Sequence, residues 1–158
     1  ICEDWPNNIV DIKCGESHTL VLTSKQTVYS CGDNYHGQLG FRGYNVDGYS
    51  YFSKIENLPK INRIECGYNH SMCIDIHNNF YIFGCNTFGQ LGVGDKKDRP
   101  NPIIHPLLQK VNDIAPGSGL QTFVKTPSNS IYAFGHNCSA QLGIQTNNET
   151  EKTPIRVF

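Results

Sequence analysis

The chain has 158 residues, of which 38% are hydrophobic and 17% charged, and its formal net charge is −1. This composition indicates a folded chain rather than a disordered one. The basic residues are mostly scattered singly, so we expect no direct binding of nucleic acid by this segment. No stretch approaches the run of about 20 apolar residues that a membrane-spanning helix needs, so no membrane association is expected.

The cysteines bear on the compartment and on metal binding. Their number is odd and no two are spaced as Cys-x2-Cys, which argues against a structural zinc motif and against a secreted disulfide framework. We therefore expect an intracellular protein, cytoplasmic or nuclear, with no metal site. The cysteines are Cys2, Cys14, Cys31, Cys66, Cys73, Cys85 and Cys138.

Three copies of a segment of about 51 residues follow one another along the chain. The Gln-Leu-Gly triplets that start at Gln38, Gln90 and Gln141 are 52 and 51 residues apart. Such a period is the signature of a repeat architecture. We expect repeat 1 at about 9–60, repeat 2 at about 61–110 and repeat 3 at about 111–158, with residues 1–8 as the tail of a preceding repeat.

Within each copy, apolar residues alternate with polar ones in short runs broken by Gly, Ser, Asn and Asp, which indicates strands and tight turns. In chain order, the first three strands of repeats 1 and 2 are expected near residues 9–14, 18–23, 27–31, 61–66, 70–76 and 79–83. A fourth strand after each triplet should contain Ile55, Ile104 and Ile155, with proline tolerated at its edge. Four strands per period predict an all-β chain of three antiparallel four-stranded propeller blades.

Two motifs make the repeat recognisable. Residues 32–40 and 84–92 both read Gly-x-Asn-x-x-Gly-Gln-Leu-Gly, and Cys-Gly-x-x-His occurs at 14–18 and 66–70. The repeat resembles that of the regulator of chromosome condensation family, and the resemblance covers nearly the whole chain. The third copy departs from the pattern, with Pro116 in place of Cys, Leu120 in place of His and Ala140 in place of the middle Gly. The resemblance implies a seven-bladed ring, so we expect this chain to be a partial propeller domain that packs against the remaining blades.

We expect the recurring residues to be structural. The glycines supply backbone angles closed to other residues, the asparagines bond their own turns and the leucines fill the core between blades. A histidine that recurs once per blade is better explained as a buried, hydrogen-bonded side chain than as a metal ligand or a catalytic base. The set comprises Gly15, His18, Gly32, Asn34, Gly37, Gln38, Leu39, Gly40, Gly67, His70, Gly84, Asn86, Gly89, Gln90, Leu91, Gly92, Gly117, Gly135, Asn137, Gln141, Leu142 and Gly143.

One segment, residues 41–52, stands out as surface because it combines aromatics with glycine and asparagine. Tyrosines in such loops are typical of protein-recognition surfaces, which makes Tyr44, Asp47, Tyr49 and Tyr51 candidate binding residues. The other interpretation is that the aromatics cap a neighbouring blade or begin the outer strand, which is the commoner role of aromatic side chains.

No motif for catalysis or for a cofactor is present: there is no Gly-x-Ser-x-Gly, no His-Glu-x-x-His and no phosphate-binding loop. We therefore expect a protein that is not an enzyme, binds no cofactor and serves as a protein-interaction module. The resemblance also implies an alternative, guanine nucleotide exchange on a small GTPase of the Ran type. A nucleotide-release assay distinguishes the two.

Overall fold

The computed structural model describes residues 6–41, 46–117 and 119–158. These residues form twelve strands in three four-stranded antiparallel sheets, here called blades 1, 2 and 3, and the described segments contain no helix that could cross a lipid bilayer. The expected all-β architecture of three four-stranded units is confirmed. Blade 1 comprises β1 (Ile9–Cys14), β2 (His18–Thr23), β3 (Val28–Asn34) and β4 (Val46–Lys54).

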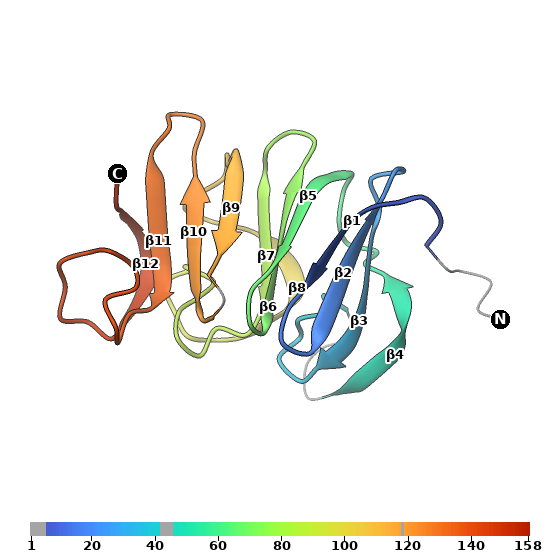
Figure 1. The fold of residues 1–158 in the computed structure, drawn as a ribbon, viewed down its shortest axis with the longest axis horizontal. Coiled ribbons are helices and arrows are strands. Elements are labelled where there is room, and N and C mark those ends of the chain that lie inside the picture. Colours follow the sequence, from blue (N-terminus) through green and yellow to red (C-terminus); the bar gives the residue numbers. More distant parts are fainter. Residues whose placement is uncertain (1–5, 42–45, 118) are drawn as a thin grey trace.

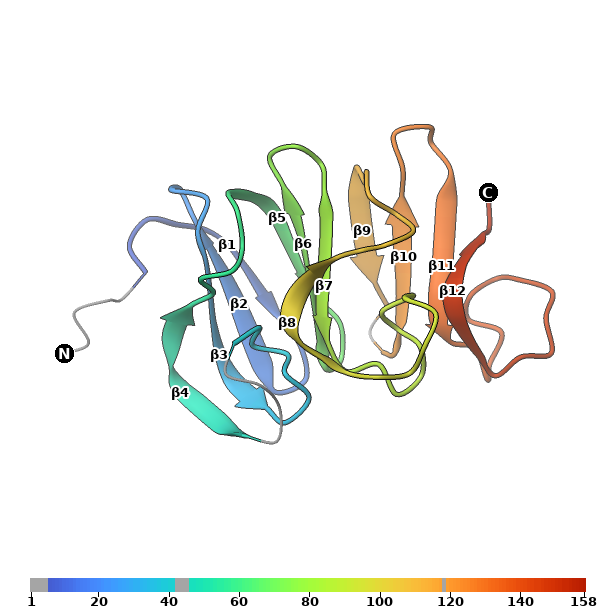
Figure 2. The same ribbon diagram turned by 180° about the vertical axis from the view of Figure 1, so that it is seen from behind.

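Blades 2 and 3 repeat this plan, each strand pairing with the one before it in the chain. Blade 2 comprises β5 (Ile61–Cys66), β6 (His70–Asp75), β7 (Phe80–Gly84) and β8 (Arg99–Ile104). Blade 3 comprises β9 (Asp113–Pro116), β10 (Gln121–Lys125), β11 (Ile131–His136) and β12 (Thr150–Arg156). The sheets stand side by side in chain order (Figures 1 and 2), and the first strands β1, β5 and β9 contact one another in turn.

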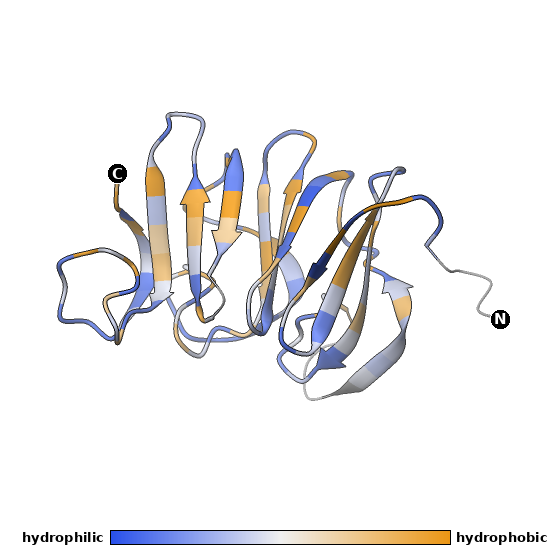
Figure 3. Ribbon diagram, in the orientation of Figure 1, coloured by the Kyte–Doolittle hydropathy of each residue, from blue (hydrophilic) through white to orange (hydrophobic). Residues whose placement is uncertain are grey.

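The hydrophobic core lies between the blades. One cluster joins blades 1 and 2 and includes Leu20, Ile64 and Phe83, while a second joins blades 2 and 3 and includes Met72 and Phe134. Every residue of β6 is buried, because this strand lies in the middle of the central blade and is covered on both faces. Figure 3 shows hydrophobic residues along the strands and mostly hydrophilic ones in the loops. Each blade therefore depends on its neighbour for burial of apolar surface.

The fourth strands begin earlier than the sequence indicates. β4 starts at Val46, which pairs with Asn34, and continues to Lys54, which pairs with Tyr29. Much of the segment expected as a surface loop is therefore strand, including Tyr49 and Tyr51. These outer strands lie at the edge of their sheets, and their exposed residues lack the apolar alternation by which a strand is recognised.

The third repeat contains an insertion that shifts its alignment. His18 pairs with Gly32 and His70 with Gly84, whereas in blade 3 the residue that pairs with Gly135 is Gln121. The assignment of Leu120 to the histidine position is therefore wrong, and Gln121 takes that place. The cause is one additional residue in the turn between β9 and β10, since Gly117 and Gly135 are 18 residues apart and the matching glycines of the other repeats are 17 apart.

Candidate functional site

A hydrogen-bonded bridge crosses the interface between blades 1 and 2. The ring nitrogen Nε2 of His18 lies 2.9 Å from Ser71 Oγ, and Ser71 Oγ donates to the carbonyl oxygen of Gln38 at 2.7 Å. A hydroxyl has one proton to donate, so Ser71 must accept from His18, whose Nε2 carries the proton. The bridge connects β2, β6 and the Gln-Leu-Gly turn, and two of its three residues, His18 and Gln38, belong to the recurring set.

The same bridge recurs between blades 2 and 3. His70 Nε2 lies 2.9 Å from Thr122 Oγ1, which donates to the carbonyl oxygen of Gln90 at 2.8 Å. Burial lowers the pKa of His70 to about 3 and that of His18 to about 4, so both imidazoles are neutral at physiological pH. The other ring nitrogen, Nδ1, has no hydrogen-bond partner in either residue. Neutral, buried rings with one nitrogen already bonded are parts of the scaffold.

The recurring asparagines and glutamines organise the turns that follow the third strands. Asn34 Oδ1 accepts from the backbone N–H of Leu39 at 3.0 Å, and Asn34 Nδ2 donates to the carbonyl oxygen of Phe41 at 3.1 Å. Gln38 Oε1 accepts from the backbone N–H of His36 at 2.9 Å. The equivalent bonds form at Asn86, Gln90, Asn137 and Gln141. These side chains bond backbone groups of a buried turn that would otherwise lack partners. Their hydrogen-bonding atoms are therefore used within the protein.

Two recurring glycines allow blades to approach each other closely. A Cβ on Gly37 would lie 2.3 Å from Pro100 Cα in blade 2, and one on Gly89 would lie 2.9 Å from Lys152 Cα in blade 3. Both glycines have positive φ, 79° and 78°. Only glycine combines this conformation with so short a distance to the next blade.

The turns after the first and third strands of each blade gather at one end of the molecule, the lower end in Figure 1, here called the loop end. Tyr35 and Tyr68 are exposed there, at 60% and 40% of their surface. The Tyr68 hydroxyl donates to a carboxylate oxygen of Glu16, which joins blades 1 and 2 at the surface. None of these three residues is repeated at the matching positions of the other repeats, and this departure is the signal that sequence reasoning overlooked.

The structure describes only two of the four predicted binding side chains, those of Tyr49 and Tyr51. Tyr44 lies outside the described residues, as does the side chain of Asp47, whose backbone belongs to β4. Tyr49 is half-buried and contacts the ring of Phe41 edge to face, with centroids 5.1 Å apart. Tyr51 is 51% exposed, and its ring meets that of Tyr49 edge to face with centroids 6.1 Å apart. The structure thus brings Tyr49 and Tyr51 together on the outer strand, and it packs Tyr49 against the blade.

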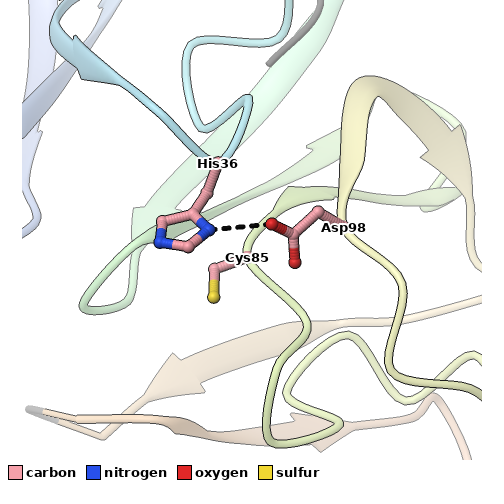
Figure 4. A group of neighbouring side chains, drawn as sticks. All are labelled: His36, Cys85 and Asp98. Atoms are coloured by element: carbon pink, nitrogen blue, oxygen red, sulfur yellow. Dashed lines mark hydrogen bonds and ion pairs between the residues drawn. The ribbon is translucent and has the colours of Figure 1, made fainter. Parts of the chain in front are cut away.

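One group of potential metal ligands is found among the described residues. His36 in blade 1 meets Cys85 and Asp98 in blade 2, and one ligand atom from each lies within 4.8 Å of the others (Figure 4). His36 Nδ1 is 2.8 Å from Asp98 Oδ2. Cys85 is 4% exposed, and burial raises the pKa of its thiol. Since His36 and Asp98 are 62 residues apart, no local spacing motif reveals the group.

Family comparison agrees with the repeated geometry. Two models described as the regulator of chromosome condensation (RCC1) repeat match the chain, one at residues 9–38 and 61–90 and the other at residues 26–74 and 78–124. The chain belongs to the RCC1 repeat family. The second model spans the boundary between consecutive blades, as do the hydrogen-bonded bridges.

Curated relatives of this RCC1-repeat chain include the human probable E3 ubiquitin-protein ligase HERC3, 33% identical over 95% of the chain, and the zebrafish protein RCC2 homolog, 44% identical over 53%. The chain spans only 14% and 17% of these relatives' lengths. Among solved structures, human WBSCR16 superposes with a TM-score of 0.83 at 22% identity, covering 95% of this chain and 39% of that one. Prp20p from Saccharomyces cerevisiae superposes at 0.84 and 20% identity, covering 96% and 38%. These similarities establish an RCC1-type propeller fold.

Proposed function

We propose that this segment is a non-enzymatic protein-interaction module that presents its loop end to a protein partner. The observation that carries the proposal is a division of labour between residues. The side chains that recur in each repeat are used in contacts between blades or within turns, whereas the exposed aromatics of the loop end do not recur. Function on a repeat scaffold resides in such variable surface groups.

The exposed groups have the chemistry of a protein-binding surface. Tyr35 and Tyr68 each offer a large, rigid ring with a polar hydroxyl, and Glu16 adds a negative charge beside Tyr68. Tyrosine is favoured at interfaces because it buries much area at small cost in side-chain entropy. The described cysteines are all free thiols, which supports an intracellular location in a reducing compartment. We extend the proposal to a ring completed by further blades of the same protein.

The test is a quantitative interaction map of the full-length protein in cells, by proximity labelling and cross-linking. We expect the double variant Tyr35→Ala, Tyr68→Ala to lose cross-links to its main partners while keeping the wild-type melting temperature. Leu107→Ala is the matched control, because Leu107 is 59% exposed and lies in the β8–β9 connection at the opposite end. Retention of all cross-links by the double variant, or their loss in the control, contradicts the proposed surface.

The second candidate is nucleotide exchange on a Ran-type GTPase. Prp20p, which shares this chain's fold, has binding properties towards Gsp1p and histones. The assay is release of a fluorescent guanine nucleotide from a panel of small GTPases in the presence of the full-length protein. If the segment serves only as an interaction module, no GTPase in the panel releases nucleotide faster, and an acceleration of about tenfold would favour exchange instead.

A further inference from the structure

We propose that His36, Cys85 and Asp98 form a zinc site that fastens blade 1 to blade 2. The three residues supply an imidazole nitrogen, a sulfur and a carboxylate oxygen, which are the ligand types that Zn²⁺ takes in proteins. Two of them come from blade 2 and one from blade 1. A bound ion therefore joins the blades across the interface in addition to the hydrogen-bonded bridge of His18 and Ser71.

The geometry is close to that of a three-ligand site. The ligand atoms lie within 4.8 Å of one another, and ligands around one tetrahedral zinc are about 3–4 Å apart, given bond lengths of about 2.0–2.3 Å. Figure 4 shows His36 and Asp98 joined by their hydrogen bond, with Cys85 beside them. To bind one ion, the side chains must rotate so that the three ligand atoms face a common point. The side chains of His36 and Asp98 are 25% and 27% exposed, so the site is open to solvent. The fourth position is then filled by water.

A second observation concerns the amide of Gln90. This side chain is fully buried, and its Nε2 makes no hydrogen bond of ordinary length. The amide nevertheless lies close enough to the Cys85 sulfur to lower the pKa of that thiol, against the larger, opposite effect of burial. In the other repeats the matching nitrogen meets a good acceptor: Gln38 Nε2 donates to Asp33 Oδ2 at 2.5 Å, and Gln141 Nε2 lies 2.8 Å from His136 Nδ1. Cys85 occupies the corresponding place in repeat 2, directly after Gly84 as Asp33 and His136 follow Gly32 and Gly135.

The missing hydrogen bond is accounted for if Cys85 binds metal as a thiolate. A neutral thiol is a weak acceptor, whereas a metal-bound thiolate is a strong one, so the Gln90 N–H group gains a partner beside the ion. Asp98 is also held in place, because its Oδ1 accepts from the backbone N–H of Asn86 at 2.7 Å. Both groups orient ligands from outside the coordination sphere.

The matching positions between blades 2 and 3 hold no such set. There Phe88 takes the place of His36 and His136 that of Cys85, and their rings meet edge to face with centroids 4.9 Å apart. The ligand set is therefore not a by-product of the repeat, since the repeat builds this interface equally well from aromatic rings.

Binding is a simple exchange of a proton for a metal ion. Zn²⁺ forms bonds to the Cys85 sulfur, the His36 imidazole and the Asp98 carboxylate, while it releases all but one of its waters. The Cys85 thiol proton passes to solvent. The proton that His36 Nδ1 donates to Asp98 moves to the other ring nitrogen when Nδ1 binds the ion, and no oxidant or reductant takes part. A metal that binds only the folded state stabilises that state.

The experiment titrates Zn²⁺ into the metal-free full-length protein, by calorimetry and by thermal melting. We expect stoichiometric binding and a higher melting temperature. Cys85→Ser, His36→Phe and Asp98→Asn should each weaken binding by at least about tenfold and remove the thermal shift. Cys138→Ser and His77→Ala are the matched controls, because both residues are exposed and lie outside the group.

Cobalt distinguishes this site from adventitious binding in the same protein. Co²⁺ bound by Cys85 gives a thiolate-to-metal charge-transfer band and tetrahedral absorption, which should vanish in Cys85→Ser and persist in Cys138→Ser. Cys85→Asp serves where the serine variant folds poorly, since it restores the Asp33-like acceptor for Gln90 and should remove the charge-transfer band. Absence of Zn²⁺ binding, or unchanged binding and spectra in the Cys85 variants, overturns the proposal.

Discussion

The two interfaces between blades are alike in their bridges and different in the residues beside them. At both, a histidine nitrogen lies 2.9 Å from a hydroxyl of the next blade. That hydroxyl donates to the backbone carbonyl oxygen of a glutamine in the Gln-Leu-Gly turn. Beside these bridges, His36, Cys85 and Asp98 meet at one interface and Phe88 meets His136 at the other. The comparison teaches that the recurring residues specify how blades pack, while the non-recurring ones are available for function.

The largest expected effect tests whether the two interfaces are equally strong. Phe83 and Phe134 are fully buried at equivalent places, and each ring packs where a glycine of the preceding repeat, Gly40 or Gly92, leaves room. Phe83→Ala and Phe134→Ala should each lower the free energy of unfolding by about 3–5 kcal/mol, because each leaves a cavity. Chemical denaturation followed by circular dichroism measures both. If the two variants lose free energy of unfolding by amounts that differ more than twofold, the two interfaces are unequal in strength.

Substitutions of the glycines that face the next blade should cause the second largest loss of stability. Gly37→Ala is expected to cost about 2–3 kcal/mol and Gly89→Ala about 1–2 kcal/mol, because the added methyl group meets backbone at a positive φ. The order follows the distances, 2.3 Å at Gly37 and 2.9 Å at Gly89. Ala140, which already has φ of 55°, provides the control. Ala140→Gly should change stability by less than about 1 kcal/mol, and a larger loss would mean that its methyl group packs.

The fold could be predicted from the sequence because the repeat supplies three views of one pattern. The bounds predicted for β1, β2 and β5 agree with the structure, since these inner strands carry apolar alternation between turn residues. The prediction missed the start of the outer strand β4, because residues that face solvent lack the apolar alternation by which a strand is recognised. The alignment at Gln121 failed because the additional residue lies inside the Cys-Gly-x-x-His motif, where the loss of the histidine leaves no landmark after Gly117.

The candidate sites were harder to predict, for a physical reason. Motif searches detect ligands that are close in sequence, whereas a propeller brings residues together across blades that are about one repeat apart. Cys85 and His36 therefore show no motif. Their only trace in the sequence is that they differ from their counterparts, Asp33 and Phe88, in otherwise similar repeats.

The buried histidines should make stability depend on pH. Their folded pKa values, about 4 for His18 and about 3 for His70, lie below the ordinary value of 6.5. Above pH 6.5 the two histidines are neutral in both the folded and the unfolded protein, so they do not make the free energy of unfolding depend on pH. As the pH falls from 6.5 towards the folded values, the unfolded state takes up protons first, and each histidine destabilises the fold by about 1.4 kcal/mol per pH unit.

His70→Gln should cost about 1–2 kcal/mol at pH 7, because a glutamine N–H only partly replaces the bond to Thr122. The variant should also show a shallower loss of stability between pH 6.5 and 4. Urea unfolding at several pH values measures both effects. Parallel profiles for the variant and the wild type would mean that His70 does not contribute to the acid sensitivity.

The smallest effect compares two neighbouring tyrosines on β4. Tyr49→Ala should cost about 1 kcal/mol, because its ring contacts Phe41 edge to face. Tyr51→Ala should cost less than about 0.5 kcal/mol, as expected for an exposed side chain. Thermal melting and partner affinity are measured on the same two variants. If Tyr51 belongs to a binding surface, its variant loses affinity at unchanged stability, whereas equal losses of stability would assign both rings to packing on blade 1.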